Sequence, residues 1–159
     1  MSKNPDSKRL ASLYDESREK LQPDERRGWL EQRMAKQLQY AYKKSSAVRE
    51  IFNKAGVSPS DIKQISDLEK LPVTTKDQLV KLQNANPPLG GFLAVPLSSL
   101  RRVYVSPGPI YDAYGPEQVN ALARSFLRIG FPRPGDVVLV STAFHMVPAG
   151  LLMTDALDM

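Results

Sequence analysis

Residues 102–112, Arg-Val-Tyr-Val-Ser-Pro-Gly-Pro-Ile-Tyr-Asp, decide the predicted fold. The first four residues are typical of a strand, and the Ser-Pro-Gly-Pro that follows is typical of a turn. Residues 115–117, Gly-Pro-Glu, then begin a helix with apolar residues at helical spacing, which ends at Gly130. A strand, a short loop and a helix in this order form the unit in which α/β proteins bind phosphate.

The loop between the strand and the helix has the position of a phosphate loop, but its residues depart from the usual chemistry. Such loops point backbone N–H groups and small hydroxyls at the anion. Ser106 and Gly108 suit this task, whereas the two prolines have no N–H to donate and the loop has no lysine. The N–H groups of Ile110 and Tyr111 are the remaining candidate donors. The alternative is a plain turn in which Gly108 relieves backbone strain.

A second strand and a further helix are predicted in the same half of the chain. Val137–Val140 is a continuous apolar run, as expected for a parallel strand covered on both faces. Another helix begins near Ala149 and is still apolar-periodic at Leu157. Residues 101–159 are therefore predicted to be the start of an α/β subdomain with its first βαβ unit. Two parallel strands make a poor domain, so we expect a truncated fold, or one completed by another chain such as a second copy.

The first half of the chain is predicted to be helical. Residues 1–88 form the expected helical N-terminal segment, and residues 89–100, which contain glycine and proline, form a linker. Several helix boundaries in this segment carry capping signals. These signals are Pro23, Gly56 and the capping boxes Ser66–Glu69 and Thr75–Gln78.

Composition excludes several function classes. The chain has no cysteine and one histidine, which removes disulfides, thiolate nucleophiles and Cys- or His-rich metal sites. No apolar run approaches the roughly 20 residues that span a bilayer, and the polar N-terminus lacks a signal peptide pattern. These features predict a cytoplasmic protein with no membrane partner.

The basic charge of the chain does not favour nucleic-acid binding. The net charge is +5, and the excess lies mainly in the first 54 residues. In that region Lys and Arg alternate with Asp and Glu at helical spacing, the pattern of a solvated helix face. Nucleic acid is therefore an unlikely partner.

Two stretches before the predicted strand resemble a known family. Residues 55–62 (AGVSPSDI) and 67–79 (DLEKLPVTTKDQL) resemble the N-terminal region of phenylacetate–CoA ligases, which belong to the adenylate-forming superfamily with acyl-CoA synthetases and luciferases. The resemblance extends from about Trp29 to the end of the chain, the front third or so of a complete member. It implies that a carboxylic acid and ATP give an acyl-adenylate and pyrophosphate. Coenzyme A then takes the acyl group, and magnesium offsets the phosphate charge.

The resemblance also implies which residues form sites. The family's phosphate loop corresponds to Ser106–Tyr111, where Ser106 and Gly108 match its residue types. The segment that begins with Phe144 and His145 resembles the aromatic/His segment between the acyl pocket and the phosphates, so these two residues are candidates for the acyl-substrate pocket. Neither catalytic residues nor metal ligands are predicted in this chain. The adenine-binding segment and the domain with the catalytic lysine would lie beyond Met159.

We therefore expect the N-terminal part of an ATP-dependent carboxylic acid–CoA ligase that acts on an aromatic or small organic acid, and that does not complete the reaction by itself. The expected partners are the acid and a nucleotide, ATP or AMP. The alternative is a non-catalytic interaction or scaffold protein derived from the same fold. That alternative predicts homo-oligomers formed through an uncovered sheet edge.

Overall fold

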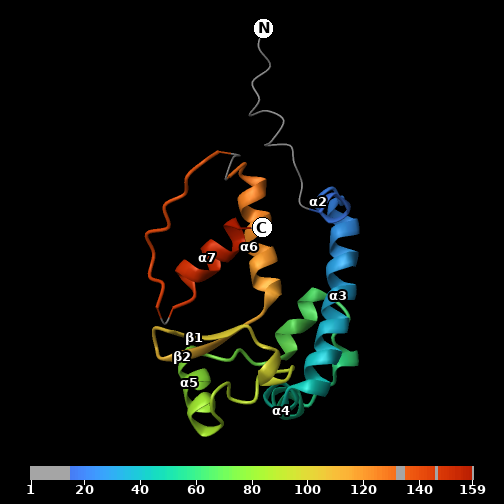
Figure 1. The fold of residues 1–159 in the computed structure, drawn as a ribbon. Coiled ribbons are helices and arrows are strands. Elements are labelled where there is room, and N and C mark those ends of the chain that lie inside the picture. The colour runs from blue at the N-terminus through green and yellow to red at the C-terminus, as the bar shows by residue number, and fades with distance from the viewer. Residues whose placement is uncertain (1–14, 132–134, 146, 159) are drawn as a thin grey trace. The chain divides into compact units, whose positions relative to one another are not determined.

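A computed structural model describes residues 15–131, 135–145 and 147–158. Its helices and strands are drawn in Figure 1, and the chain divides into two compact units. One unit is Gln22–Ala113, and the other joins the described residues up to Leu21 with those from Tyr114 onward. We describe each unit by itself.

The helices of the Gln22–Ala113 unit begin and end at capping residues. α3 begins at Pro23, where the Gln22 N–H donates to the Glu25 carboxylate at 3.0 Å. α4 ends at Gly56, whose φ of 68° is the left-handed conformation that glycine adopts without strain. Both boundaries confirm the sequence predictions. The helical elements of this unit are α3 (Pro23–Lys44), α4 (Ser46–Ala55), η1 (Pro59–Asp61), η2 (Ile65–Lys70), α5 (Lys76–Ala85) and η3 (Leu97–Ser99).

The two predicted capping boxes have different outcomes. Thr75 starts α5 as predicted: its hydroxyl accepts the Gln78 N–H at 3.3 Å, and the Gln78 side chain accepts the Thr75 N–H at 2.9 Å. The box at Ser66–Glu69 is wrong by two residues. The element there is the 3₁₀ helix η2, which is capped by Asp67 bound to the Gln64 N–H. A carboxylate accepts N–H bonds more strongly than a hydroxyl, and this decides where the turn begins.

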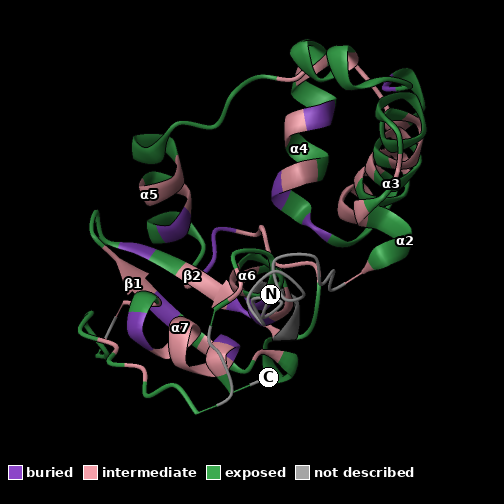
Figure 2. Ribbon diagram, turned by 90° about the horizontal axis from the view of Figure 1, so that it is seen from above, coloured by how far each residue is buried: buried purple, intermediate pink, exposed green. Residues whose placement is uncertain are grey.

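The segment predicted as a linker contributes to the interior of this unit. Leu89 is buried, and the Gly91 carbonyl accepts the Ser45 hydroxyl at 2.8 Å and the Ala47 N–H at 3.1 Å. Phe52 of α4 is the most deeply buried large side chain, with 1% of its surface exposed. The buried residues of α4 are visible in Figure 2.

The sheet is a hairpin. β1 (Arg102–Ser106) pairs with β2 (Ile110–Tyr114), and only three turn residues join them, so the strands run antiparallel. The predicted strand is confirmed, but the predicted loop from Ser106 to the helix is wrong because its second half forms β2. Tyr104 and Ile110 are the buried residues of the pair's inner face within this unit.

The second unit is mainly helical. Its elements are α2 (Glu16–Glu19), α6 (Pro116–Arg128) and α7 (Ala149–Leu157). α6 and α7 pack together, and Val119, Ala123 and Ala156 are buried between or beside them. α6 ends before Gly130, whose φ is 74°, as predicted. At the start of the predicted helical segment, α2 is a single turn, and residues 1–14 lie outside the described residues.

The apolar run Val137–Val140 forms no strand in the described chain. Val137 and Leu139 are 99% and 89% exposed. A strand requires a neighbour that supplies backbone hydrogen bonds, and no described segment lies in register beside this one. The α/β class is confirmed, with a two-stranded sheet. The element order of the described residues is β-β-α instead of the expected β-α-β.

Candidate functional site

The predicted phosphate loop is the turn of the β1–β2 hairpin. Residues 107–109 connect the strands, so Ser106 ends β1 and Ile110 begins β2. Gly108, at the exposed tip, has a φ of 152°, a conformation that side chains other than glycine rarely adopt. The Ser106 hydroxyl donates to the Ile110 carbonyl over 3.4 Å, a long bond that an anion could replace.

A lysine from another part of the chain lies over this turn. A Cβ added to Gly108 would be 2.8 Å from Cε and 3.4 Å from Nζ of Lys76. Lys76 is the first residue of α5, and its exposed side chain crosses the tip of the hairpin. The tertiary structure thus places beside the turn the cation that the loop itself lacks. In the sequence, Lys76 lies within a stretch that indicated a capping box and the family resemblance but not an anion site.

One predicted N–H donor is engaged within the protein. The N–H of Tyr111 donates to Oε1 of Gln83 at 2.8 Å, and Nε2 of Gln83 donates to the Tyr111 carbonyl at 2.8 Å. Gln83, on α5, is 4% exposed. The turn therefore offers an anion the hydroxyl of Ser106, close approach at Gly108 and the ammonium of Lys76 in preference to the backbone of Tyr111.

Phe144 and His145 lie in the irregular segment before α7, in the other compact unit. The Phe144 side chain is 42% exposed, and a Cβ added to Gly150 would be 2.8 Å from its ring. Gly150 therefore leaves room for the ring against the start of α7, and its N–H donates to the Ala143 carbonyl at 3.0 Å. The predicted site residues consequently form two groups, one on the hairpin turn and one before α7.

Known proteins are similar to this chain in both sequence and fold. No protein-family model matches it. It is 33% identical over 136 residues to phenylacetate-coenzyme A ligase of Escherichia coli (strain K12), and the match covers 80% of this chain and 30% of that protein. It is 32% identical over 141 residues to the same enzyme of Aromatoleum evansii, with 84% and 31% covered.

A solved structure of a CoA ligase also matches this chain. The crystal structure of 2-hydroxyisobutyryl-CoA ligase in the postadenylation state, in complex with 2-HIB-AMP, matches with a TM-score of 0.80 and 29% identity. The match covers 87% of this chain and 30% of that chain. The chain is similar to phenylacetate–CoA ligases over most of its own length. It spans about 30% of the length of these relatives.

The β1–β2 hairpin borders an apolar pocket of about 350 Å³. α5, β2 and the segment around Leu93 contribute its walls. The lining includes Leu79, Leu89, Phe92 and Leu93, with Gln83 and Asp112 as polar members. Its volume is within the range of small-molecule pockets.

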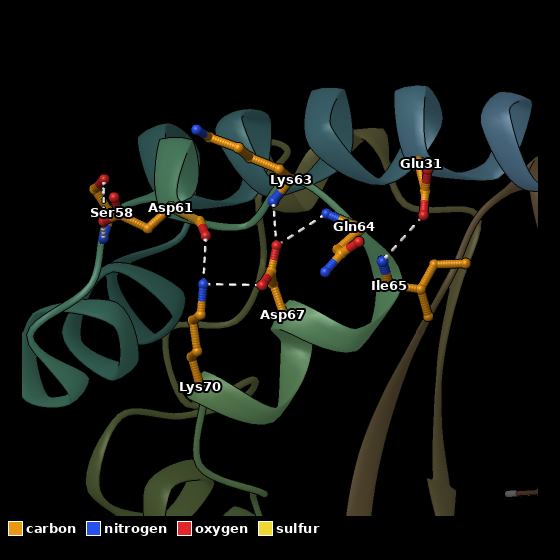
Figure 3. Close-up of polar contacts among 8 residues, drawn as sticks. All are labelled: Glu31, Ser58, Asp61, Lys63, Gln64, Ile65, Asp67 and Lys70. Atoms are coloured by element: carbon orange, nitrogen blue, oxygen red, sulfur yellow. Dashed lines mark hydrogen bonds and ion pairs between the residues drawn. The ribbon is translucent and has the colours of Figure 1, made fainter.

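A polar network joins residues of the segment between α4 and α5 (Figure 3). Oδ2 of Asp67 accepts the N–H groups of Lys63 at 2.9 Å and Gln64 at 3.1 Å, while Oδ1 pairs with Nζ of Lys70 at 2.9 Å. The same ammonium donates to the Asp61 carbonyl at 3.0 Å. The hydrogen bond from Lys70, followed by those of the two backbone N–H groups, lowers the pKa of Asp67 to about 2. The Asp67 carboxylate therefore stabilises the local fold of this segment through these bonds.

A second carboxylate in the network closes the turn after α4. Asp61 accepts the hydroxyl and the N–H of Ser58, each at 2.7 Å, and these bonds lower its pKa. Together the two carboxylates order the segment between α4 and α5.

No described helix is long and apolar enough to cross a membrane.

Proposed function

We propose that the chain is the part of an ATP-dependent carboxylic acid–CoA ligase that holds the nucleotide phosphates at the Gly108 turn. The observation that carries the proposal is the Lys76 side chain, which lies against Gly108. The relatives named above are CoA ligases, and one solved relative is bound to an acyl-AMP. The proposed substrate is an aromatic or small organic acid, with ATP and CoA as co-substrates.

The proposed reaction has two steps. The carboxylate oxygen of the acid attacks the α-phosphorus of ATP, and pyrophosphate leaves. The thiol of CoA then attacks the acyl carbon, and AMP leaves as the thioester forms. The first step brings together two anions, so positioning and positive charge are what the protein must supply.

Lys76 supplies that charge at the turn. Because the prolines of the turn have no N–H and Gln83 holds the N–H of Tyr111, the turn has few backbone donors for an anion. A charged donor forms hydrogen bonds about twice as strong as neutral ones. Gly108 leaves room for the Lys76 side chain beside the turn, and the Ser106 hydroxyl is a neutral donor. Magnesium, when bound, would offset phosphate charge and take most of its ligands from phosphate oxygens and water.

Phe144 and His145 are proposed to line the acyl pocket in the whole ligase. The exposed face of Phe144 offers apolar area for the acid, and the imidazole of His145 offers a hydrogen-bonding edge. A scaffold role without nucleotide is not favoured, because the relatives of this chain are ligases and the turn carries a cation beside it.

Isothermal titration tests the proposal. Mg·ATP, AMP and pyrophosphate are titrated separately into the 159-residue chain, with sodium sulfate as a control for nonspecific anion binding. We expect saturable binding of Mg·ATP and pyrophosphate that sulfate does not reproduce at equal ionic strength. If neither ATP, AMP nor pyrophosphate binds, the nucleotide role is excluded for this chain.

A further inference from the structure

Gln83 is a buried side chain whose amide bonds both backbone polar groups of one residue of β2, Tyr111. Its amide accepts the N–H of Tyr111 and donates to the carbonyl of Tyr111, both at 2.8 Å. Only 4% of the residue is exposed. A buried amide in this position holds the strand as a neighbouring strand would, with one donated and one accepted bond.

Gln83 and Lys76 lie on the same helix, and each contacts the hairpin. They are seven residues apart in α5, which places them on one face at a separation of roughly 10 Å, at 1.5 Å per residue. On the hairpin, the partner of Lys76 is Gly108 in the turn, and the partner of Gln83 is Tyr111 in β2. α5 therefore contacts the hairpin both at its tip and at β2.

We propose that Gln83 is the positioning residue of the anion-binding turn. By fixing Tyr111 to α5, it sets the place of Gly108 relative to Lys76 and so controls how tightly the turn binds an anion. The identity of that anion as nucleotide phosphate rests on the proposed function. The positioning of the turn against Lys76 does not.

The chemistry of glutamine explains why this residue type suits the position. The amide has an acceptor and a donor group in one plane, which suits the N–H and C=O that a single extended residue such as Tyr111 presents on the same side of its strand. A carboxylate would keep the acceptor but repel the Tyr111 carbonyl. It would also add negative charge near the turn. Methionine has a similar length but lacks both hydrogen-bonding groups.

Three variants of the full chain test the role. Q83M removes both bonds, and Q83E removes the donated bond at neutral pH. N84A, at the exposed neighbouring position on α5, is the matched control. The first measurement is amide hydrogen exchange of Tyr111 by NMR, corrected for the intrinsic rate at each pH. The second is the NOE between the Lys76 side chain and the Gly108 Hα protons, and the third is calorimetric affinity for Mg·ATP. Far-UV circular dichroism confirms that each variant is folded.

We expect Tyr111 to exchange about 5- to 100-fold faster in Q83M than in the unaltered chain, the range for a lost buried hydrogen bond. The Lys76–Gly108 NOE should weaken, and the affinity for Mg·ATP should fall at least about fivefold, while N84A changes none of these. In Q83E, protection of Tyr111 should return as the pH falls from 7 towards 5. The protonated carboxyl regains an O–H donor, and burial raises the pKa of such a group. A merely space-filling role would not show this recovery.

The outcomes separate this inference from the proposed function. Equal Tyr111 exchange in the unaltered chain, Q83M and N84A would overturn the positioning role, whether or not ATP binds. Faster exchange in Q83M with an unchanged NOE and unchanged anion affinity would also overturn it, because Gln83 would then hold β2 without placing the turn. If the unaltered chain binds no nucleotide, but Q83M still loses both Tyr111 protection and the NOE, the proposed function fails and the positioning role stands.

Discussion

Lys76 occupies the space that a side chain at position 108 would need: its Cε is 2.8 Å from the place of a Cβ on Gly108. The contact joins the first residue of α5 to the tip of the β1–β2 hairpin. The Lys76 side chain therefore places a cation beside a turn whose two prolines have no N–H to donate. Under the proposed function, this cation would replace part of the attraction that a glycine- and hydroxyl-rich loop provides.

Replacing Gly108 with alanine should disturb the turn in two ways. The φ of 152° is unfavourable for alanine, at a cost of about 1–3 kcal/mol in the free energy of unfolding. The new methyl group should also displace the end of the Lys76 side chain, so the affinity for Mg·ATP should fall. Urea unfolding and calorimetry measure the two effects. The control is G28A, a position in α3 with nothing within 4 Å, which should be stabilised by about 0.5–1 kcal/mol. A G108A chain as stable as the unaltered one would contradict the assigned strain.

Replacing Lys76 with methionine should remove the charge and keep most of the side-chain length. We expect the affinity for Mg·ATP to fall about tenfold or more, the effect of losing a hydrogen bond to a charged group, and the salt dependence of binding to decrease. Stability should change by less than about 0.5 kcal/mol because the side chain is exposed. K81M, an exposed lysine of the same helix, serves as the control. Equal losses in K76M and K81M would indicate a general charge effect and not a contact at the turn.

Replacing Asp67 with asparagine should reveal a pH-dependent contribution to stability. The folded-state pKa of Asp67 is about 2, below its ordinary value of 3.8. The carboxylate therefore stabilises the fold above pH 3.8, and this contribution is lost as the pH falls through about 2. D67N should lower the urea midpoint at pH 7, and the difference from the unaltered chain should vanish near pH 2. E69Q, in the same 3₁₀ helix, should behave like the unaltered chain. A D67N midpoint that is unchanged at pH 7 would show that the network in Figure 3 contributes nothing to stability.

Adding charge to the exposed apolar run should reduce self-association. Val137 and Leu139 are 99% and 89% exposed, and unpaired apolar segments with strand character promote pairing between chains. We predict that the 159-residue chain forms homo-oligomers, and that the double variant V137D/L139D lowers the mass measured by light scattering. V73D, at another exposed valine (84%), should not lower it. A monomeric unaltered chain over the accessible concentration range would refute the prediction.

Local capping chemistry made several elements predictable. The helix that starts at Thr75, the end of α4 at Gly56 and the end of α6 before Gly130 all agree with the structure. Each depends on residues within four positions of one another, so the sequence contains the complete interaction. The box at Ser66–Glu69 failed because Asp67 accepts the N–H groups of Lys63 and Gln64, so the helical turn begins two residues earlier.

The strand predictions show what a local pattern cannot decide. The residues of β1 were predicted as a strand, but its partner β2 was not, because Tyr111 and Asp112 were assigned to a loop before a helix. The run Val137–Val140 has the pattern of a buried strand, yet it is exposed in the structure. Strand formation depends on a partner elsewhere in space, and the pattern of one segment does not supply it.

The sequence by itself determined the family resemblance, the start of α5 at Thr75 and the ends of α4 and α6. These follow from short-range spacing and from residue types that act on their immediate neighbours. Only the tertiary structure decided that Lys76 provides the cation at Gly108, and that Gln83 holds the N–H of Tyr111. Both contacts join α5 to the hairpin across a long stretch of chain, and contacts of that kind depend on how the intervening residues pack.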